Sequence, residues 1–222
     1  MKLILNTYFS HFSDKDYIKS FIFSVGLLFA SLYVNFYASL YASKVASAPV
    51  TDIILSNIRV YDVESIFVYG PWIFWIFITI ITISKPNRIP FIIKNIAMFV
   101  LIRSVFITLT HIGPFPTATL IESSKLVNNF TSTGDLFFSA HTGLPFLMCL
   151  VFWKEKIWRY IMLVTSIFFG AVVLMGHLHY TIDVVAAFFI TYSIFSLSIF
   201  FFKKDFDFFN NGPIKEKVQE IL

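Results

Sequence analysis

The sequence predicts an all-α, polytopic membrane protein, and three observations support this fold class. Of its 222 residues, 57% are hydrophobic and only 14% are charged, whereas an ordinary soluble domain carries about a quarter charged residues. Six segments of the sequence approach the roughly 20 apolar residues that a membrane-spanning helix needs. The stretches between them are polar or turn-forming. These features together exclude an ordinary soluble globular domain.

The six expected helices follow one another with mostly short connections. Residues 85–88 (Lys-Pro-Asn-Arg) and 154–156 (Lys-Glu-Lys) are typical of short turns. Residues 113–134 form a longer loop with two prolines and mixed polar residues. The six expected transmembrane helices cover residues 18–42, 65–84, 91–112, 136–153, 158–176 and 180–202.

This pattern predicts three parts of the chain. Residues 1–17 form an N-terminal segment, residues 18–202 form the six-helix transmembrane domain, and residues 203–222 form a charged C-terminal tail. We expect the third to sixth helices to form the bundle that carries the functional site, with the first two helices at its periphery.

Lys and Arg are distributed unevenly over the two sides of the expected membrane. Thirteen of the 17 lie on the side that holds both termini, three lie on the opposite side, and Arg103 lies within the third helix. Because short loops rich in Lys and Arg stay in the cytoplasm, both termini are expected to be cytoplasmic. The net charge of +4 reflects these flanking residues, so it does not indicate nucleic-acid binding.

Most other ionisable residues near the apolar segments gather at one depth. His141 lies near the start of the fourth helix, and His179 and Asp183 lie at the start of the sixth. Asp135 belongs to the same layer, and Arg103 approaches it from within the third helix. Charged and imidazole groups near hydrocarbon are costly and therefore indicate a functional site. The predicted orientation places this layer on the extracytoplasmic face.

The spacing of these residues suits phosphoryl chemistry. His179 and Asp183 are four residues apart, so on a helix they lie on one face within contact distance. A carboxylate beside an imidazole fixes its tautomer and supports positive charge on the ring, which makes His179 a competent nucleophile or base. His141, from another helix, is expected to supply the proton for a leaving group. Such a site needs no metal or other cofactor.

The same sequence offers groups that would hold a phosphate. Arg103 is the buried cation available for phosphate oxygens, and its planar guanidinium suits that task. The Ser139 hydroxyl and the amides near Ala140 and His141 would complete a cradle at the start of a helix.

Other interpretations of the same residues stay open at this point. Arg103 could instead pair with Asp135 or with backbone carbonyl groups, and His111 and His177 fit ordinary interfacial residues. Three histidines and two acids could bind zinc, but no helix presents two ligands in the His-Glu-x-x-His spacing. A transporter would also place ionisable residues in the membrane, although here they occupy one outer layer and leave the other half apolar. A catalytically silent membrane protein is the remaining alternative.

Residues 134–142 (Gly-Asp-Leu-Phe-Phe-Ser-Ala-His-Thr) resemble the signature Cys-Gly-Asp-x-x-x-Ser-Gly-His-Thr. This signature is found in the sphingomyelin synthases, a branch of the type-2 phosphatidic acid phosphatase superfamily. Residues 179–184 (His-Tyr-Thr-Ile-Asp-Val) resemble their His-Tyr-Thr-[Val/Ile]-Asp-Val block. Arg103, followed by a Thr-rich stretch and Pro-x-Pro, is similar to their Arg-containing segment, and residues 48–52 are weakly similar to an early Pro-rich Asp motif.

The resemblance implies a function and roles for the residues. His179 would be the nucleophile that takes a phosphoryl unit from a phospholipid, supported by Asp183, with His141 as acid–base partner. The substrate-binding residues would be Arg103, Asp135, Ser139 and Thr142. The protein would act on a phospholipid, with a lipid alcohol or water as acceptor, which makes it either a head-group transferase or a lipid phosphate phosphatase.

The chain also departs from these families. Ala140 replaces Gly, Thr133 replaces Cys, and Val173 stands where the wider phosphatase superfamily would place an arginine. The Lys-x6-Arg-Pro box of that superfamily is missing from the sequence. A site with one arginine matches the single negative charge of a phosphodiester better than a phosphomonoester. The sequence therefore favours head-group transfer, with hydrolysis as the alternative.

Overall fold

A computed structural model describes residues 8–119 and 135–211 of the chain. Within these residues the structure is helical, with irregular connections and no strand. The helices are α2 (Lys15–Val45), α3 (Glu64–Ile83), the short 3₁₀ helix η1 (Pro86–Arg88), α4 (Ile89–Leu109), α6 (Ala140–Val151), α7 (Lys156–Met175), α8 (Thr181–Phe201) and α9 (Lys203–Asn211). The all-α prediction is confirmed for the part of the chain that the structure describes.

Within the described residues, five helices are long and apolar enough to cross a membrane: α2, α3, α4 together with η1, α7 and α8. Each lies within a few residues of a predicted span. The helix at the predicted fourth span differs, because α6 has only 12 residues. Residues 136–139, the first part of the predicted span, are irregular although they include three consecutive apolar residues. The described residues therefore show five helices of spanning length and the shorter α6, and the count of six spans stays a prediction.

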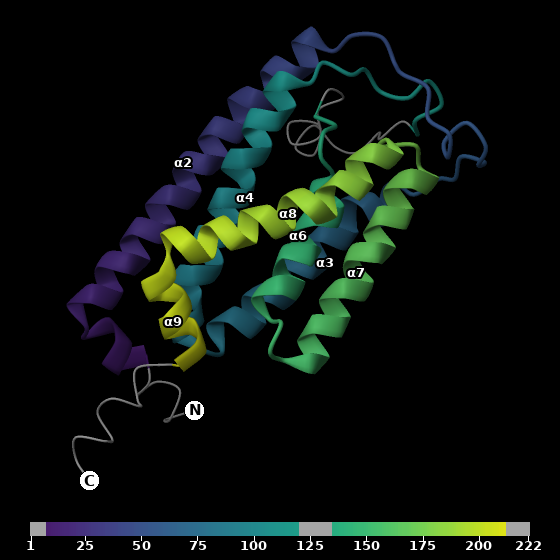
Figure 1. The fold of residues 1–222 in the computed structure, drawn as a ribbon. Helices are drawn as coiled ribbons and strands as arrows, with labels where there is room; N and C mark the ends of the chain where they lie inside the picture. The colour runs from purple at the N-terminus through teal and green to yellow at the C-terminus, as the bar shows by residue number, and fades with distance from the viewer. Residues whose placement is uncertain (1–7, 120–134, 212–222) are drawn as a thin grey trace.

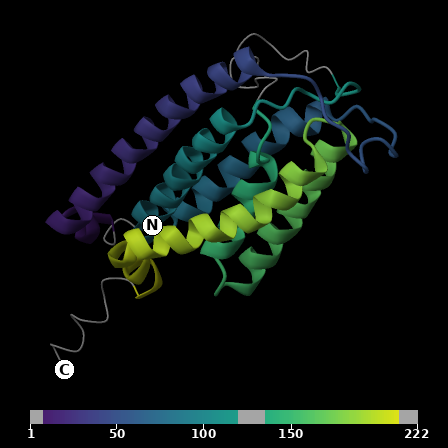
Figure 2. The same cartoon turned by 45° about the horizontal axis from the view of Figure 1, so that its top comes forward.

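The helices form a bundle in which α6 is central (Figure 1). α2 packs along α4 on one side of the molecule, whereas α6 packs against both α7 and α8. Figure 2 shows α2 and α4 on the flank of the molecule away from α7. In this view α8 runs between the α2–α4 pair and α7. The starts of α6 and α8 lie at the same end of the bundle (Figure 1).

Close packing around α6 depends on a residue without a side chain. A Cβ atom built on Gly143 would lie 2.7 Å from the Phe99 ring of α4 and 2.9 Å from Thr191 Oγ1 of α8. Gly143 therefore lets α6 approach both neighbouring helices, and the core around Phe99, Phe138 and Leu147 is fully buried. This packing holds the start of α6 at a fixed position in the bundle.

The opposite end of the bundle contains two buried ion pairs. Lys94 Nζ lies 2.6 Å from Asp205 Oδ2, and Arg88 Nη2 lies 2.7 Å from Glu155 Oε1. Lys94 and Arg88 are both nearly inaccessible to solvent. The sequence predicted that the half of the protein away from the histidines is apolar, and these two ion pairs are exceptions to that prediction. The beginning of the predicted tail is also structured, because Asp205 belongs to α9.

Candidate active site

His179 and Asp183 meet at the start of α8, through a geometry that differs from the predicted helical pair. His179 precedes the helix, Tyr180 is the N-cap, and Asp183 is the third helical residue. The Asp183 carboxylate accepts the backbone N–H of Tyr180 at 2.9 Å, which is the N3-to-N-cap half of a capping box. Nδ1 of His179 lies 3.4 Å from the same carboxylate oxygen. The contact predicted from the sequence is thus present, and it leaves Nε2 of His179 pointing away from the acid.

Asp183 has a second carboxylate oxygen with a different environment. Its Oδ1 is buried and has no hydrogen-bond partner among the described residues. Buried polar atoms nearly always have a partner. The site therefore has unused acceptor capacity directly beside His179.

His141 is the second residue of α6, and its side chain packs against α3. Its ring stacks on Phe67 of α3, with 4.1 Å between ring centroids and 24° between planes. Its Nε2 lies 3.3 Å from the Phe67 carbonyl oxygen. α3 therefore forms part of the wall of the site, whereas the sequence predicted a peripheral position for it.

The two imidazoles face each other across a short gap. The ring centroids of His141 and His179 are 6.4 Å apart, and their planes are inclined by 58°. The backbone N–H of Ser139, which caps α6, donates to the carbonyl oxygen of Asp183 at 3.2 Å. This hydrogen bond joins the start of α6 to the first turn of α8, so it fixes the position of His141 relative to His179.

Arg103 is engaged by the irregular segment that leads into α6. Its Nη2 lies 2.5 Å from Asp135 Oδ1, its Nε donates to the carbonyl oxygen of Phe138 at 2.8 Å, and its Nη2 also donates to the carbonyl oxygen of Asp135. Asp135 additionally accepts from Ser39 Oγ of α2 at 3.2 Å. Non-helical backbone at membrane depth needs such partners for its polar groups. Arg103 thus pairs with Asp135 and with backbone carbonyl groups, which is one of the interpretations that the sequence left open.

Ser139 and Thr142 are buried and bonded to each other. The Ser139 hydroxyl caps α6 by accepting the N–H and the hydroxyl of Thr142, at 3.4 and 3.3 Å. The Thr142 carbonyl accepts from Ser166 of α7 at 2.7 Å. Both side chains therefore fix the start of α6 behind the histidines.

Asp52 is a residue of the site region that sequence reasoning missed. It lies in the connection between α2 and α3 and is only 8% exposed. Its carboxylate accepts the backbone N–H and the hydroxyl of Thr181, the first residue of α8, at 2.7 and 2.8 Å. Burial raises the pKa of the Asp52 carboxyl, but the hydrogen bonds from Leu55, Thr181 and Ile54 outweigh it and hold this pKa below its usual value. The available signal was the weak resemblance of residues 48–52 to an Asp-containing family motif.

The Tyr180 side chain bonds two connecting segments, one after α2 and one after α4, to the start of α8. Its hydroxyl donates to the carbonyl oxygen of Gly113 at 2.8 Å and accepts the N–H of Val50 at 3.2 Å. Its side chain is fully buried. Together with Asp52, Tyr180 joins residues 46–63 and 110–119 to the helix that presents His179 and Asp183.

The other two outer histidines have separate environments. His177 is buried, its Nδ1 lies 2.6 Å from Thr117 Oγ1, and its backbone has a φ of 54°. This left-handed conformation turns the chain between α7 and α8. His111 is exposed, and its Nε2 lies 3.2 Å from the carbonyl oxygen of Thr108. His111 thus fits the interfacial interpretation, whereas His177 is an internal residue of the turn.

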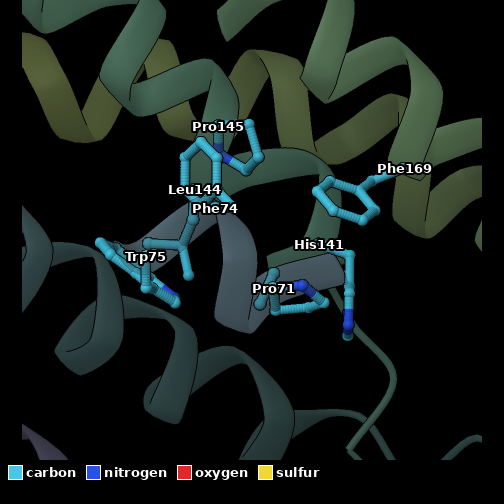
Figure 3. Close-up of a pocket in the computed structure, with 8 residues that line it drawn as sticks. Pro71, Phe74, Trp75, His141, Leu144, Pro145 and Phe169 are labelled. Carbon is cyan, nitrogen blue, oxygen red and sulfur yellow. The ribbon is translucent and has the colours of Figure 1, made fainter. Parts of the chain in front are cut away.

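An apolar cavity of about 80 Å³ adjoins His141. Figure 3 shows the His141 ring beside Pro71 and Phe169, with Phe74, Trp75, Leu144 and Pro145 around the remainder of the cavity. α3, α6 and α7 supply these residues. The cavity brings apolar surface to within contact of one of the two imidazoles.

Two departures from the family motifs can be placed in the structure. Ala140 is the first helical residue of α6, so it needs no left-handed conformation. Val173 is fully buried in a small cluster with Phe67, Val68 and Val184. An apolar contact thus occupies the position where the wider superfamily would have a cation. Among the described residues, no three His, Cys, Asp or Glu side chains are grouped to hold a metal ion.

Part of the chain matches the model of a known protein family. The family model described as "PAP2 superfamily C-terminal" matches residues 132–200, about a third of the chain, which include His141, His179 and Asp183. The match supports a relationship to the type-2 phosphatidic acid phosphatase superfamily, a family of membrane lipid phosphatases and phosphotransferases. No curated protein matches the chain, and no solved structure does.

Proposed function

We propose that the protein is a membrane-embedded lipid phosphotransferase of the sphingomyelin synthase type, which moves a phosphorylated head group through a phosphohistidine. The observation that carries this proposal is the approach of the His141 and His179 rings to 6.4 Å, with Asp183 beside Nδ1 of His179. An attacking nitrogen lies about 3–3.5 Å from the atom it attacks, and a proton donor lies about 3 Å from its acceptor. The short separation of the ring centroids supports the action of both imidazoles on one phosphoryl group.

The first half-reaction begins at His179. The Asp183 carboxylate accepts a hydrogen bond from Nδ1–H and holds the ring so that the Nε2 lone pair attacks phosphorus, and the positive charge that forms on the ring is stabilised by this carboxylate. The bond between phosphorus and the diacylglycerol oxygen breaks, and His141 donates a proton to the departing oxygen. Nε2 of His141 is directed at the Phe67 carbonyl, so Nδ1 is the nitrogen that serves the leaving group.

The second half-reaction reverses these roles. The neutral His141 accepts the proton of an incoming hydroxyl group, whose oxygen attacks the phosphohistidine. The bond between phosphorus and Nε2 of His179 breaks, and the free enzyme returns. A lipid alcohol as acceptor yields a new head-grouped lipid, whereas water yields a released phosphate compound.

The start of α6 is the part of the site best placed to hold phosphate oxygens. The first N–H groups of a helix lack intrahelical partners and favour anions, and α6 begins at Ala140 and His141. The start of α8 differs, because Asp52 already occupies its first N–H. Arg103 acts indirectly, because it holds residues 135–138, which lead into the start of α6. Direct contact of Arg103 with a phosphate oxygen is a separate prediction.

The surroundings of the site suit a lipid substrate that reaches it from the extracytoplasmic leaflet. The apolar cavity between α3 and α6 offers room for the first part of an acyl chain beside His141. We infer from the Lys and Arg distribution that both termini are cytoplasmic. In this arrangement residues 136–153 complete the sixth crossing, with the irregular segment and α6 acting together, and α4, α6, α7 and α8 form the catalytic bundle.

Product analysis with purified protein tests the proposal. The protein is incubated with a phosphocholine lipid plus ceramide and, separately, with a short-chain phosphatidic acid, and the lipids are identified by mass spectrometry. A new head-grouped lipid is expected. Free phosphate release from phosphatidic acid alone would instead establish the phosphatase alternative.

Variants identify the groups that carry the reaction. His179→Ala and Asp183→Asn are each expected to reduce turnover by a factor of about 10² or more, with membrane insertion and yield unchanged. His111→Ala is the matched control, because this exposed histidine lies at the same end of the bundle outside the site. Full turnover in purified His179→Ala would refute the assignment.

A further inference from the structure

A second cavity, of about 250 Å³, lies at the end of the bundle opposite the candidate active site. Three elements meet there: the turn containing η1, the connection between α6 and α7, and the end of α9. Lys85, Arg88 and Lys154 line it, with Glu155 as the single acidic lining residue. The lining therefore carries an excess of positive charge.

Arg88 is held in this cavity in a fixed orientation. Its guanidinium lies 5.5 Å from the centroid of the Phe152 ring and 5.4 Å from that of the Phe209 ring. One side of the guanidinium is occupied, because Nη2 pairs with Glu155 at 2.7 Å. Its Nε is buried and lacks a hydrogen-bond partner among the described residues. A buried guanidinium donor without a partner is costly, which indicates a missing acceptor.

The two lysines add charge that the described residues do not neutralise. Lys85 and Lys154 are exposed, and neither has an ion-pair partner in the described part of the chain. Both lie next to residues at the ends of apolar helices, and the neighbouring Trp153 is 54% exposed. Exposed tryptophans at helix ends are typical of the membrane–water interface. The cavity is thus placed at the level of lipid head groups.

We propose that this cavity binds the phosphate of an anionic phospholipid head group from the cytoplasmic leaflet. Arg88 would donate to a phosphate oxygen from the buried side, and Lys85 and Lys154 would close over it from the exposed side. Basic cavities between membrane helices on the cytoplasmic side suit such head groups, and arginine suits phosphate recognition. The site is separate from the proposed reaction and rests only on the membrane orientation proposed with it.

Binding measurements on the full-length protein in detergent test this site. The probes are dihexanoyl phosphatidylglycerol, dihexanoyl phosphatidylcholine and inorganic phosphate, and native mass spectrometry with thermal shifts reports binding. We expect phosphatidylglycerol to bind more tightly than phosphatidylcholine. Competition by millimolar inorganic phosphate would support recognition of the phosphate alone, and its failure to compete would support recognition of the whole lipid head group.

A pair of variants isolates the cavity from general surface charge. The double variant Lys85→Gln/Lys154→Gln is expected to weaken phosphatidylglycerol binding by about tenfold or more. Lys156→Gln/Lys204→Gln is the control, because it removes the same charge from exposed lysines at the same end that do not line the cavity. Equal loss in both double variants, or equal binding of the two lipids, would overturn the proposal.

A variant that binds phosphatidylglycerol more tightly provides a further test, because misfolding would weaken binding and not strengthen it. Glu155→Gln removes the negative charge from the lining and frees Nη2 of Arg88, so tighter phosphatidylglycerol binding is expected. Weaker or unchanged binding would count against the site. The same measurements on His179→Ala should give the same affinities, which separates this outcome from any failure of the proposed reaction.

Discussion

Asp183 is bonded to the start of the helix that carries it and also contacts His179. One carboxylate oxygen accepts the Tyr180 N–H and lies beside His179, so the helix cap and the contact proposed to act in the reaction share a single atom. Asp52 performs the complementary task from a different segment, because it binds the first N–H of the same helix. The first turn of α8 is thus positioned by two carboxylates. At the residue scale, the placement of His179 depends on both.

We expect Asp52→Asn to destabilise the protein by about 1–2 kcal/mol, as for the loss of a helix cap. The pH dependence has a definite sign. Because the folded pKa of Asp52 lies below its ordinary value, its contribution is fully present above the unfolded pKa and is lost as pH falls through the folded pKa.

Thermal unfolding in detergent at a series of pH values checks this prediction. The difference in Tm between the wild-type protein and Asp52→Asn should be constant from pH 7 to about pH 5 and should shrink below about pH 4. A difference that grows on acidification would contradict it.

At the scale of the element, α6 is short and its position is set by contacts at both of its faces. Gly143 permits the approach of α4 and α8, and Ser139 caps the helix while bonding to the start of α8. The irregular segment before it is held by Arg103 and Asp135. The position of His141 is therefore a property of how α6 is docked.

Gly143→Ala should destabilise the protein by about 1–3 kcal/mol, because the added methyl overlaps the Phe99 ring. Gly26→Ala in α2 is the matched control, since a Cβ there meets nothing within 4 Å. That control is expected to stabilise by up to about 1 kcal/mol. Unfolding of both variants in mixed micelles, with turnover measured in parallel, checks the pair. Similar effects of the two substitutions would show that α6 is not tightly docked.

A double-mutant cycle on Arg103 and Asp135 separates a structural role from phosphate binding. Arg103→Gln and Asp135→Asn should each cost about 3 kcal/mol or more, because each leaves a buried charge without its partner. The double variant should cost less than the sum. If Arg103 also contacts phosphate, Arg103→Gln will raise KM for the lipid well beyond the effect of Asp135→Asn. An additive cycle would show that the pair is not coupled.

The sequence predicted the long helices and the pairing of His179 with Asp183 well, because both depend on local spacing. It placed the start of α6 too early, since Leu136, Phe137 and Phe138 are apolar and local pattern alone extends the helix through them. The partners that let this segment stay irregular come from distant parts of the chain, chiefly Arg103, which is 35 residues away from Phe138. Asp52 was missed for a similar reason, because Thr181 is 129 residues away. Contacts between distant segments leave no periodic signal.

At the scale of the whole molecule, polar networks close both ends of the bundle. One end joins Asp52, Tyr180 and the loops around the histidines, and the other joins Lys94 to Asp205 and Arg88 to Glu155. The long apolar helices run between these two layers. This arrangement would let the proposed reaction and the proposed lipid recognition occupy opposite faces of one small protein.

The central position of α6 has a consequence for the lipid around the protein. Twelve residues extend about 18 Å, well short of the hydrocarbon core, but α6 is enclosed by α4, α7 and α8 and therefore meets protein and not acyl chains. The long outer helices set the hydrophobic thickness that the bilayer has to match. Reconstitution into nanodiscs of dilauroyl, dimyristoyl and dioleoyl lipids should show turnover falling in the thinnest lipid, because these long helices, and not α6, meet the mismatch.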